Sequence, residues 1–449
     1  MLTETTKEIG GWGNYPIVES QVVEPRNNHD LKESLRTPLI ARGLGRSYGD
    51  QAVNERKRVA ICTHFNHFLS FEEQTGVLEL EAGASLEEII AAFAPRGWLP
   101  MICPGTKWVT VGGAIANDIH GKAHHIDGSF VNCLLSFTIL LADNSVVTAS
   151  REHNPDLFWG SVGGLGLLGI ITTARIRLRK VETTYFRQKA VKVNNLDEML
   201  EAVEKYDKEY NYSVAWIDAL AGSKQLGRGV LSLGNAATLK DLPDQLRQEP
   251  LKIHPQRSLL SVPLFLPDFT LNNFTVRVLN SVIGFVQNSS KEFVHYEKFF
   301  FPLDAIGNWN RGYGTRGFIQ YQFVIPEKDG RATLKTILEM IGRSGCTPFL
   351  NVFKKMGAGQ GILSFPFKGY TLAIDFPVTR KLASFTKELD EVVLKAGGRL
   401  YLGKDAMMSR EGFRAMYPQY KEWLQIKAKY DPHNRFTSNI SRRLGLEVS

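Results

Sequence analysis

The chain has 449 residues, of which 43% are hydrophobic and 22% charged, and it carries a formal net charge of +8. This length favours two domains over a single core. No apolar run of about 18 residues occurs, which excludes a membrane-spanning helix, and the polar start 1–8 is not that of a secretory signal. The excess of basic residues permits an anionic partner, but no long lysine/arginine tract points to nucleic acid. We expect a cytoplasmic protein.

Four cysteines, at positions 62, 103, 133 and 346, lie far apart and lack the spacing of a metal site. We expect them to be free thiols in a reducing compartment.

Short strands, helices and glycine turns alternate over roughly the first 180 residues. Ser85 and Glu88 have the spacing of a capping box, and Asn154 with Pro155 is typical of a helix start. The expected elements, in chain order, are a strand at 77–82, a helix at 86–94, two strands within 135–148, a short helix from Pro155 and a strand at 170–178.

The pattern changes after about residue 185, where longer helices and more aromatic residues appear. We expect helices at 196–210 and 382–396, strands at 318–325 and 370–376, and a loop-rich stretch at 243–288. The resulting fold class is α+β, with a first domain over 1–184, a second domain over 185–397 and a tail over 398–449 that completes the first domain.

The glycine-rich segment 41–50, Ala-Arg-Gly-Leu-Gly-Arg-Ser-Tyr-Gly-Asp, is the strongest local signal. Backbone without Cβ atoms can approach a ligand closely and offer several N–H groups at once. Arg42 and Arg46 can neutralise phosphate charge. The segment predicts a site for a phosphate-rich cofactor.

The glycines at 164, 166 and 169 match the dinucleotide motif literally. That motif requires a strand before it and a helix after it, whereas here a helix precedes and a strand follows. We therefore reject a Rossmann site and expect these glycines to end a helix close to a flat ligand.

A second cluster spans 104–122, with paired glycines at 112 and 113 and the polar residues Thr106 and Thr110. His120, Lys122, His124 and His125 follow. No carboxylate or cysteine completes a metal set, so no metal is expected. We place His120 and Lys122 at the site, and interpret His124 and His125 as ordinary polar loop residues.

With these segments the chain resembles the FAD-dependent vanillyl-alcohol-oxidase (p-cresol-methylhydroxylase-type) family. The resemblance runs from Gly11-Trp-Gly13 to 441–444 and includes the segments 41–50, 111–116, 118–122 and 398–401. It extends through 320–322, 351–354 and 415–418. It implies a two-subdomain FAD-binding domain and a cap domain with an antiparallel sheet and helices.

The resemblance also implies cofactor-binding residues, with the first glycine loop around the pyrophosphate and later residues along the flavin. They are Arg42, Gly43, Leu44, Gly45, Arg46, Ser47, Gly105, Thr106, Thr110, Gly112, Asn117, His120, Gly121, Ile171 and Tyr401. Many relatives hold FAD covalently through a histidine of the first loop. Tyr48 occupies the equivalent neighbourhood here, so we expect non-covalent FAD.

Alcohol oxidation by a flavin needs a group that takes the hydroxyl proton and positive charge beside the reduced ring. The resemblance makes Lys404 and His120 the catalytic candidates, since burial lowers the pKa of a lysine enough to let it act as a base. The substrate-binding candidates are Lys122, Tyr48, Gln322, Tyr321 and Lys354. Gln320 and Gln322 share one face of their strand, so at least one residue of 320–322 faces away from the site.

Two positions depart from the members that the chain resembles most. Those members carry a cysteine at the position of Ala373 and an asparagine at that of Thr371. The changes bear on substrate fit and remove no catalytic group.

The resemblance implies oxidation of the C2 hydroxyl of a polyprenyl-phosphate-linked pentose to the 2-keto sugar, the first half of an epimerisation that supplies arabinan precursors for the cell wall. It implies a separate NAD(P)H-dependent short-chain reductase as partner. The excess positive charge and the loop-rich stretch 243–288 suit a lipid-phosphate substrate at a membrane surface, so we expect peripheral contact with the inner membrane face. Two alternatives remain open: a stand-alone sugar or alditol oxidase that uses oxygen, and a flavin-free polysaccharide-binding or scaffold protein.

Overall fold

A four-stranded sheet, in the order β1-β2-β4-β3, carries the first glycine loop. We describe it in a computed structural model, which covers residues 2–253, 260–288 and 291–448. The elements are β1 (Glu4–Gly10), β2 (Ile17–Val23), α1 (Asn28–Ser34), β3 (Leu39–Arg42) and β4 (Arg58–Ile61). Leu39 and Ile40 bury β3 against the core, so the loop after Arg42 starts from a fixed strand end.

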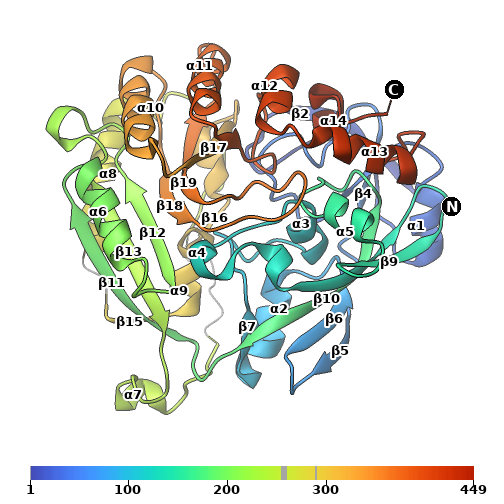
Figure 1. Cartoon of the computed structure of the whole chain (residues 1–449), viewed down its shortest axis with the longest axis horizontal. Coiled ribbons are helices and arrows are strands. Elements are labelled where there is room, and N and C mark those ends of the chain that lie inside the picture. Colours follow the sequence, from blue (N-terminus) through green and yellow to red (C-terminus); the bar gives the residue numbers. More distant parts are fainter. Residues whose placement is uncertain (1, 254–259, 289–290, 449) are drawn as a thin grey trace.

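A second sheet, in the order β5-β6-β10-β8-β9 with β7 paired to β10, forms the other half of the first domain. Its long strand β10 leads directly into the first cap strand (Figure 1). Its elements are β5 (Phe68–Glu72), β6 (Val77–Glu81), α2 (Leu86–Phe93), β7 (Trp98–Pro100), α3 (Val111–Ala116), α4 (His124–Asp127), β8 (Leu134–Leu140), β9 (Val146–Ser150), α5 (Pro155–Ser161) and β10 (Ile170–Lys180).

The cap is an eight-stranded antiparallel sheet in the order β15-β11-β13-β12-β18-β19-β17-β20. Helices α6, α10 and α11 lie along its outer side (Figure 1). The elements are β11 (Tyr185–Val193), α6 (Leu196–Tyr206), β12 (Tyr212–Ile217), β13 (Gly229–Ala236), α7 (Asp244–Arg247), α8 (Asn273–Asn288), β15 (Phe293–His295), α9 (Tyr296–Phe300), β17 (Phe318–Pro326), α10 (Gly330–Ser344), β18 (Asn351–Met356), β19 (Gly369–Pro377), α11 (Leu382–Lys395) and β20 (Arg399–Leu400). A separate parallel pair joins β14 (Leu260–Ser261) to β16 (Ile306–Gly307).

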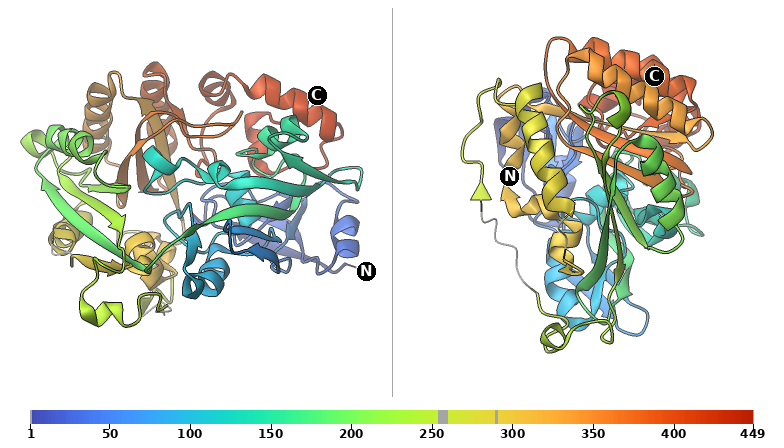
Figure 2. Two further views of the ribbon diagram at one scale, coloured as in Figure 1. Left: turned by 60° about the horizontal axis from the view of Figure 1, so that its bottom comes forward. Right: turned by 90° about the vertical axis from the view of Figure 1, so that its left-hand side faces the viewer.

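The tail crosses from the cap sheet back to the first domain. Its strand β20 pairs with β17, and its helices α12 (Arg410–Met416), α13 (Tyr420–Tyr430) and α14 (Asn439–Leu444) lie over the first domain (Figures 1 and 2). Trp423 Nε1 donates to Gly160 O at 2.8 Å, and Arg443 forms an ion pair with Asp50 at 2.7 Å. These contacts are consistent with a tail, 398–449, that completes the first domain. The exact domain boundaries at 184 and 397 stay a prediction.

Most predicted elements are confirmed. Ser85 and Glu88 form the capping box of α2, and the motif at 164–169 lies between α5 and β10, in the order that excludes a Rossmann site. Asn154 stands before α5, but its side chain donates to Thr148 O instead of capping the helix. All four cysteines are free.

The loop-rich interpretation of 243–288 is wrong for its last part, because α8 occupies 273–288; residues 254–259 lie outside the described range. Asn272 Oδ1 accepts from the backbone N–H groups of Phe274 and Thr275 and starts the helix. Asn280 Nδ2 donates to Asp218 Oδ1 at 2.7 Å. These tertiary contacts override the weak helix propensity of the segment. Within the described ranges no helix is long and apolar enough to cross a membrane.

Candidate active site

A cavity of about 580 Å³ lies where the two halves of the first domain, the cap and the tail meet. Three glycine-rich segments form one part of its wall: the first loop, the 104–120 segment and the 165–171 turn. Cap strands β17, β18 and β19 and the tail residues Tyr401, Gly403 and Lys404 form the other part. The cavity therefore brings together segments that are far apart in the sequence.

The first glycine loop lies in close backbone contact with the N-terminus of α3. A Cβ atom on Gly43 would stand 2.2 Å from Thr110 Oγ1, and Gly45 has φ +66°. The Arg42 guanidinium packs against Gly45 of the loop and donates to Gly10 O at 2.7 Å and Ala52 O at 2.9 Å; burial lowers its pKa to about 10. Arg42 thus holds the loop in place, and both Arg42 and the residues after it line the cavity.

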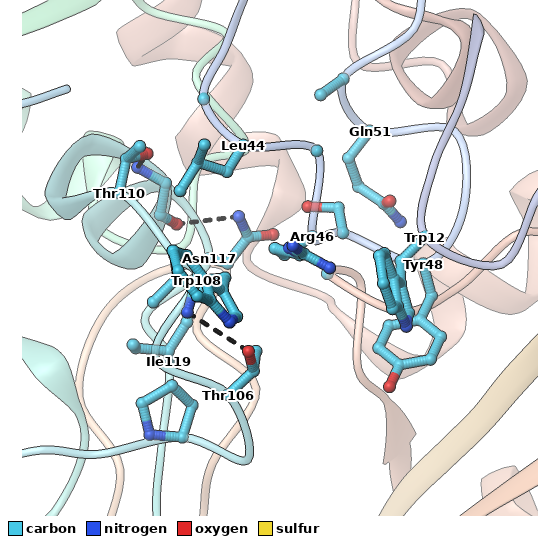
Figure 3. A pocket seen from close by; sticks show the side chains of 18 of the residues that line it. Trp12, Leu44, Arg46, Tyr48, Gln51, Thr106, Trp108, Thr110, Asn117 and Ile119 are labelled. Carbon is cyan, nitrogen blue, oxygen red and sulfur yellow. Dashed lines mark hydrogen bonds between the residues drawn. The ribbon is translucent and has the colours of Figure 1, made fainter. Parts of the chain in front are cut away.

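Thr110 and Asn117 mark the two ends of α3 at the cavity wall (Figure 3). The Thr110 hydroxyl accepts from Gly113 N at 3.3 Å and caps the helix. Asn117 Nδ2 donates to Gly113 O at 2.9 Å, and Asn117 O accepts from the Tyr401 hydroxyl at 2.8 Å. Tyr401 is thereby fixed to the glycine-rich wall although it comes from the tail.

Among the residues that the structure describes, four buried polar atoms on the cavity wall have no hydrogen-bond partner: Arg46 Nε, Asn117 Oδ1, His120 Nδ1 and Gln322 Oε1. Leaving such atoms without partners is costly unless a ligand satisfies them. Figure 3 shows Arg46 between Asn117 and Trp12, and its guanidinium lies 4.0 Å from the Trp12 ring centroid. An elongated ligand with polar edges, such as FAD, fits these donors and acceptors and the glycine backbone beside them.

Lys404 enters the cavity from the tail and donates to Gln320 Oε1. Gln320 Nε2 donates in turn to Asp375 Oδ1, and the Tyr313 hydroxyl donates to Asp375 Oδ2 at 2.8 Å. Burial lowers the pKa of Lys404, and the Asp375 carboxylate opposes that shift. Burial raises the pKa of Asp375.

His120 and Gln322 meet on the same wall, with His120 Nε2 3.2 Å from Gln322 Nε2. Gln322 Nε2 also donates to Thr371 Oγ1 at 3.0 Å. Burial, followed by the charge of Lys354, lowers the pKa of His120 well below its usual value, so the imidazole is neutral. Burial lowers the pKa of Lys354 to about 7, with Lys404 and Lys122 contributing.

Asp118 fixes the loop that presents His120. It has φ +40° and its carboxylate accepts from the Ser129 hydroxyl at 2.7 Å, from Val131 N at 3.0 Å and from the Ser364 hydroxyl. Burial raises its pKa to about 6. Because Ser364 belongs to the cap, Asp118 also ties the two domains together beside the site.

Most predicted site residues line this cavity: Arg42, Gly43, Leu44, Gly45, Arg46, Ser47, Tyr48, Gly105, Thr106, Thr110, Gly112, Asn117, His120, Ile171, Gln322, Lys354, Tyr401 and Lys404. Tyr48 is half-buried, with its ring 5.6 Å from that of Phe318. The departures from the family also fall here, since Ala373 lines the cavity and Thr371 bonds to Gln322.

Three predicted site residues lie elsewhere. Lys122 Nζ donates to Phe299 O and does not reach the cavity wall. The Tyr321 hydroxyl donates to Asp390 Oδ1 at 2.8 Å on the other face of the sheet, as strand alternation requires. Gly121 packs against Cys103 O, where a Cβ would stand 2.4 Å away. The structure gives no support to their assigned binding roles.

His124 is not the ordinary polar loop residue that the sequence suggests, because it is buried and its Nδ1 accepts from Gly357 N at 3.0 Å. The predicted set also omitted Trp12, Asp304 and Trp309 on the cavity wall, and Asp375 behind Gln320. Asp375 could have been noticed as an acidic residue within the apolar strand 370–376. In the described parts of the chain no cluster of His, Cys, Asp and Glu could hold a metal ion.

Two family models match the chain, one for an FAD binding domain over residues 20–150 and one for D-arabinono-1,4-lactone oxidase over residues 313–444. Together with the cavity and the two-domain fold, they define an FAD-dependent oxidoreductase of the vanillyl-alcohol-oxidase type. FAD as the cofactor and the expected fold class are confirmed, while its non-covalent attachment stays a prediction.

The chain is 40% identical over 458 aligned positions to decaprenylphosphoryl-β-D-ribose oxidase of Mycolicibacterium smegmatis, covering 98% of both chains. It belongs to the family of that oxidase. It is also 31% identical over 379 positions to an uncharacterised protein in the mprA 5′ region of Streptomyces coelicolor, covering 81% of this chain and 100% of that one. A carbohydrate oxidase of Microdochium nivale is 30% identical over 111 positions, 24% of this chain and 22% of its own.

Proposed function

We propose that the chain oxidises the C2 hydroxyl of a polyprenyl-phosphate-linked pentose, similar to decaprenylphosphoryl-ribose, to the 2-keto sugar. The observation that carries this proposal is that two half-buried lysines, Lys354 and Lys404, lie together with two buried amides, those of Gln320 and Gln322, on the cavity wall. Amides recognise sugar hydroxyls, and ammonium groups recognise phosphate. The name of the Mycolicibacterium relative agrees with this substrate class.

FAD would be held by the backbone of the first glycine loop and by Thr110, Asn117 and Tyr401. When bound, it supplies an acceptor for the two electrons that leave the carbinol carbon. We propose that it is held without a covalent bond. In support, loss of solvation raises the pKa of the Tyr48 hydroxyl well above its usual value, which leaves no reactive phenolate in the first loop.

Lys404 is the proposed base for the hydroxyl proton. Its lowered pKa makes the neutral amine accessible, and its bond to Gln320 fixes the position of Nζ. Because His120 is neutral and its Nε2 accepts from Gln322 Nε2, its unpartnered Nδ1 carries the proton and can donate a hydrogen bond to a sugar oxygen. In this proposal Lys354 binds the substrate phosphate from the cap.

The 2-keto product retains its lipid phosphate, and reduction of the ketone from the opposite side would invert C2. We propose that a separate NAD(P)H-dependent short-chain reductase performs that step, completing a 2′-epimerisation that leads to arabinan precursors. We further propose that the enzyme meets its lipid-linked substrate at the inner face of a membrane.

One observation favours a second candidate, a stand-alone sugar or alditol oxidase that uses oxygen. Residues 313–444 match the family model for D-arabinono-1,4-lactone oxidase, and part of the chain is similar to a carbohydrate oxidase. Both names describe oxidases that act on sugars or sugar derivatives. The half-buried Lys354 on the cavity wall argues for a phosphate-bearing substrate instead, because a phosphate supplies a counterion for its charge and a neutral sugar does not.

The test is the position of oxidation. Decaprenylphosphoryl-ribose is incubated with the flavin-loaded enzyme, the product is reduced with borodeuteride, and the sugar is analysed by mass spectrometry. Deuterium at C2 is expected. Deuterium at another carbon, or peroxide formed from free sugar alcohols without turnover of the lipid-linked pentose, would favour the second candidate.

A further inference from the structure

Large apolar side chains are unusually exposed between residues 260 and 279. Leu260, Leu264, Phe269 and Phe274 are 70%, 76%, 79% and 76% exposed. Among large apolar residues in the rest of the described chain, the most exposed is Val146 at 56%. Clustered exposure of this kind marks an interaction surface, whereas scattered single residues do not.

This apolar segment begins at the wall of the active-site cavity. Strand β14 pairs with β16, and Ser261 and Ile306 from the two strands line the cavity. The segment then follows the residues after β16, since Val262 N donates to Gly307 O at 2.9 Å and Leu266 N to Arg311 O at 3.0 Å. The exposed residues are thus continuous with the cavity mouth.

Helix α8 continues the same surface, with apolar side chains on its outer side as well as on its inner side. Its inner side buries Val276 and bonds Asn280 to Asp218. Phe274 and Val278, four residues apart and therefore on one face, are exposed with Arg277. Figure 2, right, shows α8 and the segment that leads into it along one outer side of the molecule. Apolar side chains directed outward beside an arginine are typical of helices that lie in a membrane interface.

The charge around the surface is positive. The stretch 260–281 contains two charged residues, Asp268 and Arg277, and Asp268 forms an ion pair with Arg316 at 2.8 Å. Arg311 donates to Pro263 O at 2.7 Å and lies 6.0 Å from the Phe265 ring centroid. An apolar surface with arginines at its edge, on a chain of net charge +8, is complementary to anionic lipid headgroups.

We propose that the surface of residues 260–279 docks onto an anionic lipid bilayer and places the cavity mouth at the headgroup level. This proposal rests on the proposed function. A decaprenyl chain is too large to fit in a cavity of about 580 Å³ that also holds a flavin. The lipid chain of the substrate must therefore leave through the cavity mouth. With the docking surface at that mouth, the sugar enters the cavity while the lipid chain stays in the bilayer.

The first experiment measures co-sedimentation of the flavin-loaded protein with vesicles of phosphatidylglycerol and phosphatidylcholine, without any sugar. The double variant Phe269→Ser/Phe274→Ser is expected to lower vesicle affinity on the order of tenfold or more, because two exposed phenyl groups no longer insert. The matched control Val146→Ser removes an exposed apolar residue elsewhere and should leave affinity unchanged. Equal binding of the double variant and the wild type, or no binding by either, overturns the proposal.

The second experiment compares substrates. The double variant should oxidise a short-chain farnesylphosphoryl pentose in solution as the wild type does, and should lose about tenfold in rate on a decaprenyl substrate embedded in vesicles. Equal rates on the embedded substrate would contradict docking. Loss of self-association by the double variant in light scattering, with vesicle binding intact, would assign the surface to a second copy. If vesicle binding is lost as expected but no lipid-linked pentose is oxidised, the proposed function fails and the docking surface stands.

Discussion

Asp375 and Lys404 are joined through one amide, that of Gln320, which donates to the carboxylate and accepts from the ammonium. Gln320 and Asp375 are direct cross-strand partners in β17 and β19, whereas Lys404 arrives from the tail. The carboxylate therefore acts on the proposed base without touching the cavity, as a positioning residue.

Asp375→Asn should move the pH dependence of flavin reduction to lower pH by about one unit. Lys404 must lose a proton to act as a base, so the rate rises with pH through its pKa. Because the Asp375 charge raises that pKa, its removal brings the rise to lower pH. The measurement is the anaerobic reduction rate against pH.

Asp390→Asn is the matched control for this shift. Asp390 is a partly buried acid on the opposite face of the sheet, bonded to Tyr321, and its neutralisation should leave the profile in place. An unchanged midpoint in Asp375→Asn, or an equal shift in both variants, would contradict the role of Asp375.

Lys354→Met should stabilise the flavin-free protein and weaken substrate binding. Folding lowers the Lys354 pKa from 10.5 to about 7, so the partly desolvated cation costs stability in full below about pH 7 and not above 10.5. We expect a gain of ~2 kcal/mol in the free energy of unfolding at about pH 6, which fades toward pH 10.5. Urea unfolding at several pH values measures it.

The same Lys354→Met variant should raise KM for a lipid-phosphate pentose about tenfold with a smaller change in kcat, because one phosphate contact is lost. The exposed Lys335 on α10 provides the control, Lys335→Met, which should alter neither quantity. A destabilised Lys354→Met protein with normal KM would remove Lys354 from the site.

Gly43→Ala should cost FAD affinity on the order of tenfold or more. The added methyl would meet Thr110 Oγ1 at 2.2 Å, which displaces the cap of α3 and the loop together. Flavin fluorescence titration measures the loss. Gly342→Ala, at a position where a Cβ has open space, should bind FAD normally; equal affinity of both variants would contradict the placement of the first loop.

Local signals predicted the parts of the fold that depend on neighbours in sequence. Ser85 and Glu88 act within one helical turn, and the order of α5 and β10 around Gly164 excluded a Rossmann site without any long-range information. Helix α8 was missed because its stability depends on contacts such as Asn280 to Asp218, between residues distant in the chain.

The site shows the same division. Strand alternation correctly placed Gln320 and Gln322 on one face, and the glycine segments marked the cavity wall. Lys122 was placed in the site because it follows His120 closely, but its ammonium is bound by the Phe299 carbonyl. Asp375 was missed because its partner Gln320 is brought to it by strand pairing.

The central claim is tested most directly by mixing the flavin-loaded protein anaerobically with decaprenylphosphoryl-ribose and following flavin absorbance, with Lys404→Met in parallel. We expect rapid bleaching of the wild type, and a yellow Lys404→Met protein that keeps its FAD and bleaches about a hundredfold or more slowly. Free ribose should bleach neither. A wild-type flavin that stays oxidised with the lipid-linked pentose, or a Lys404→Met protein that bleaches at the wild-type rate, would contradict the account.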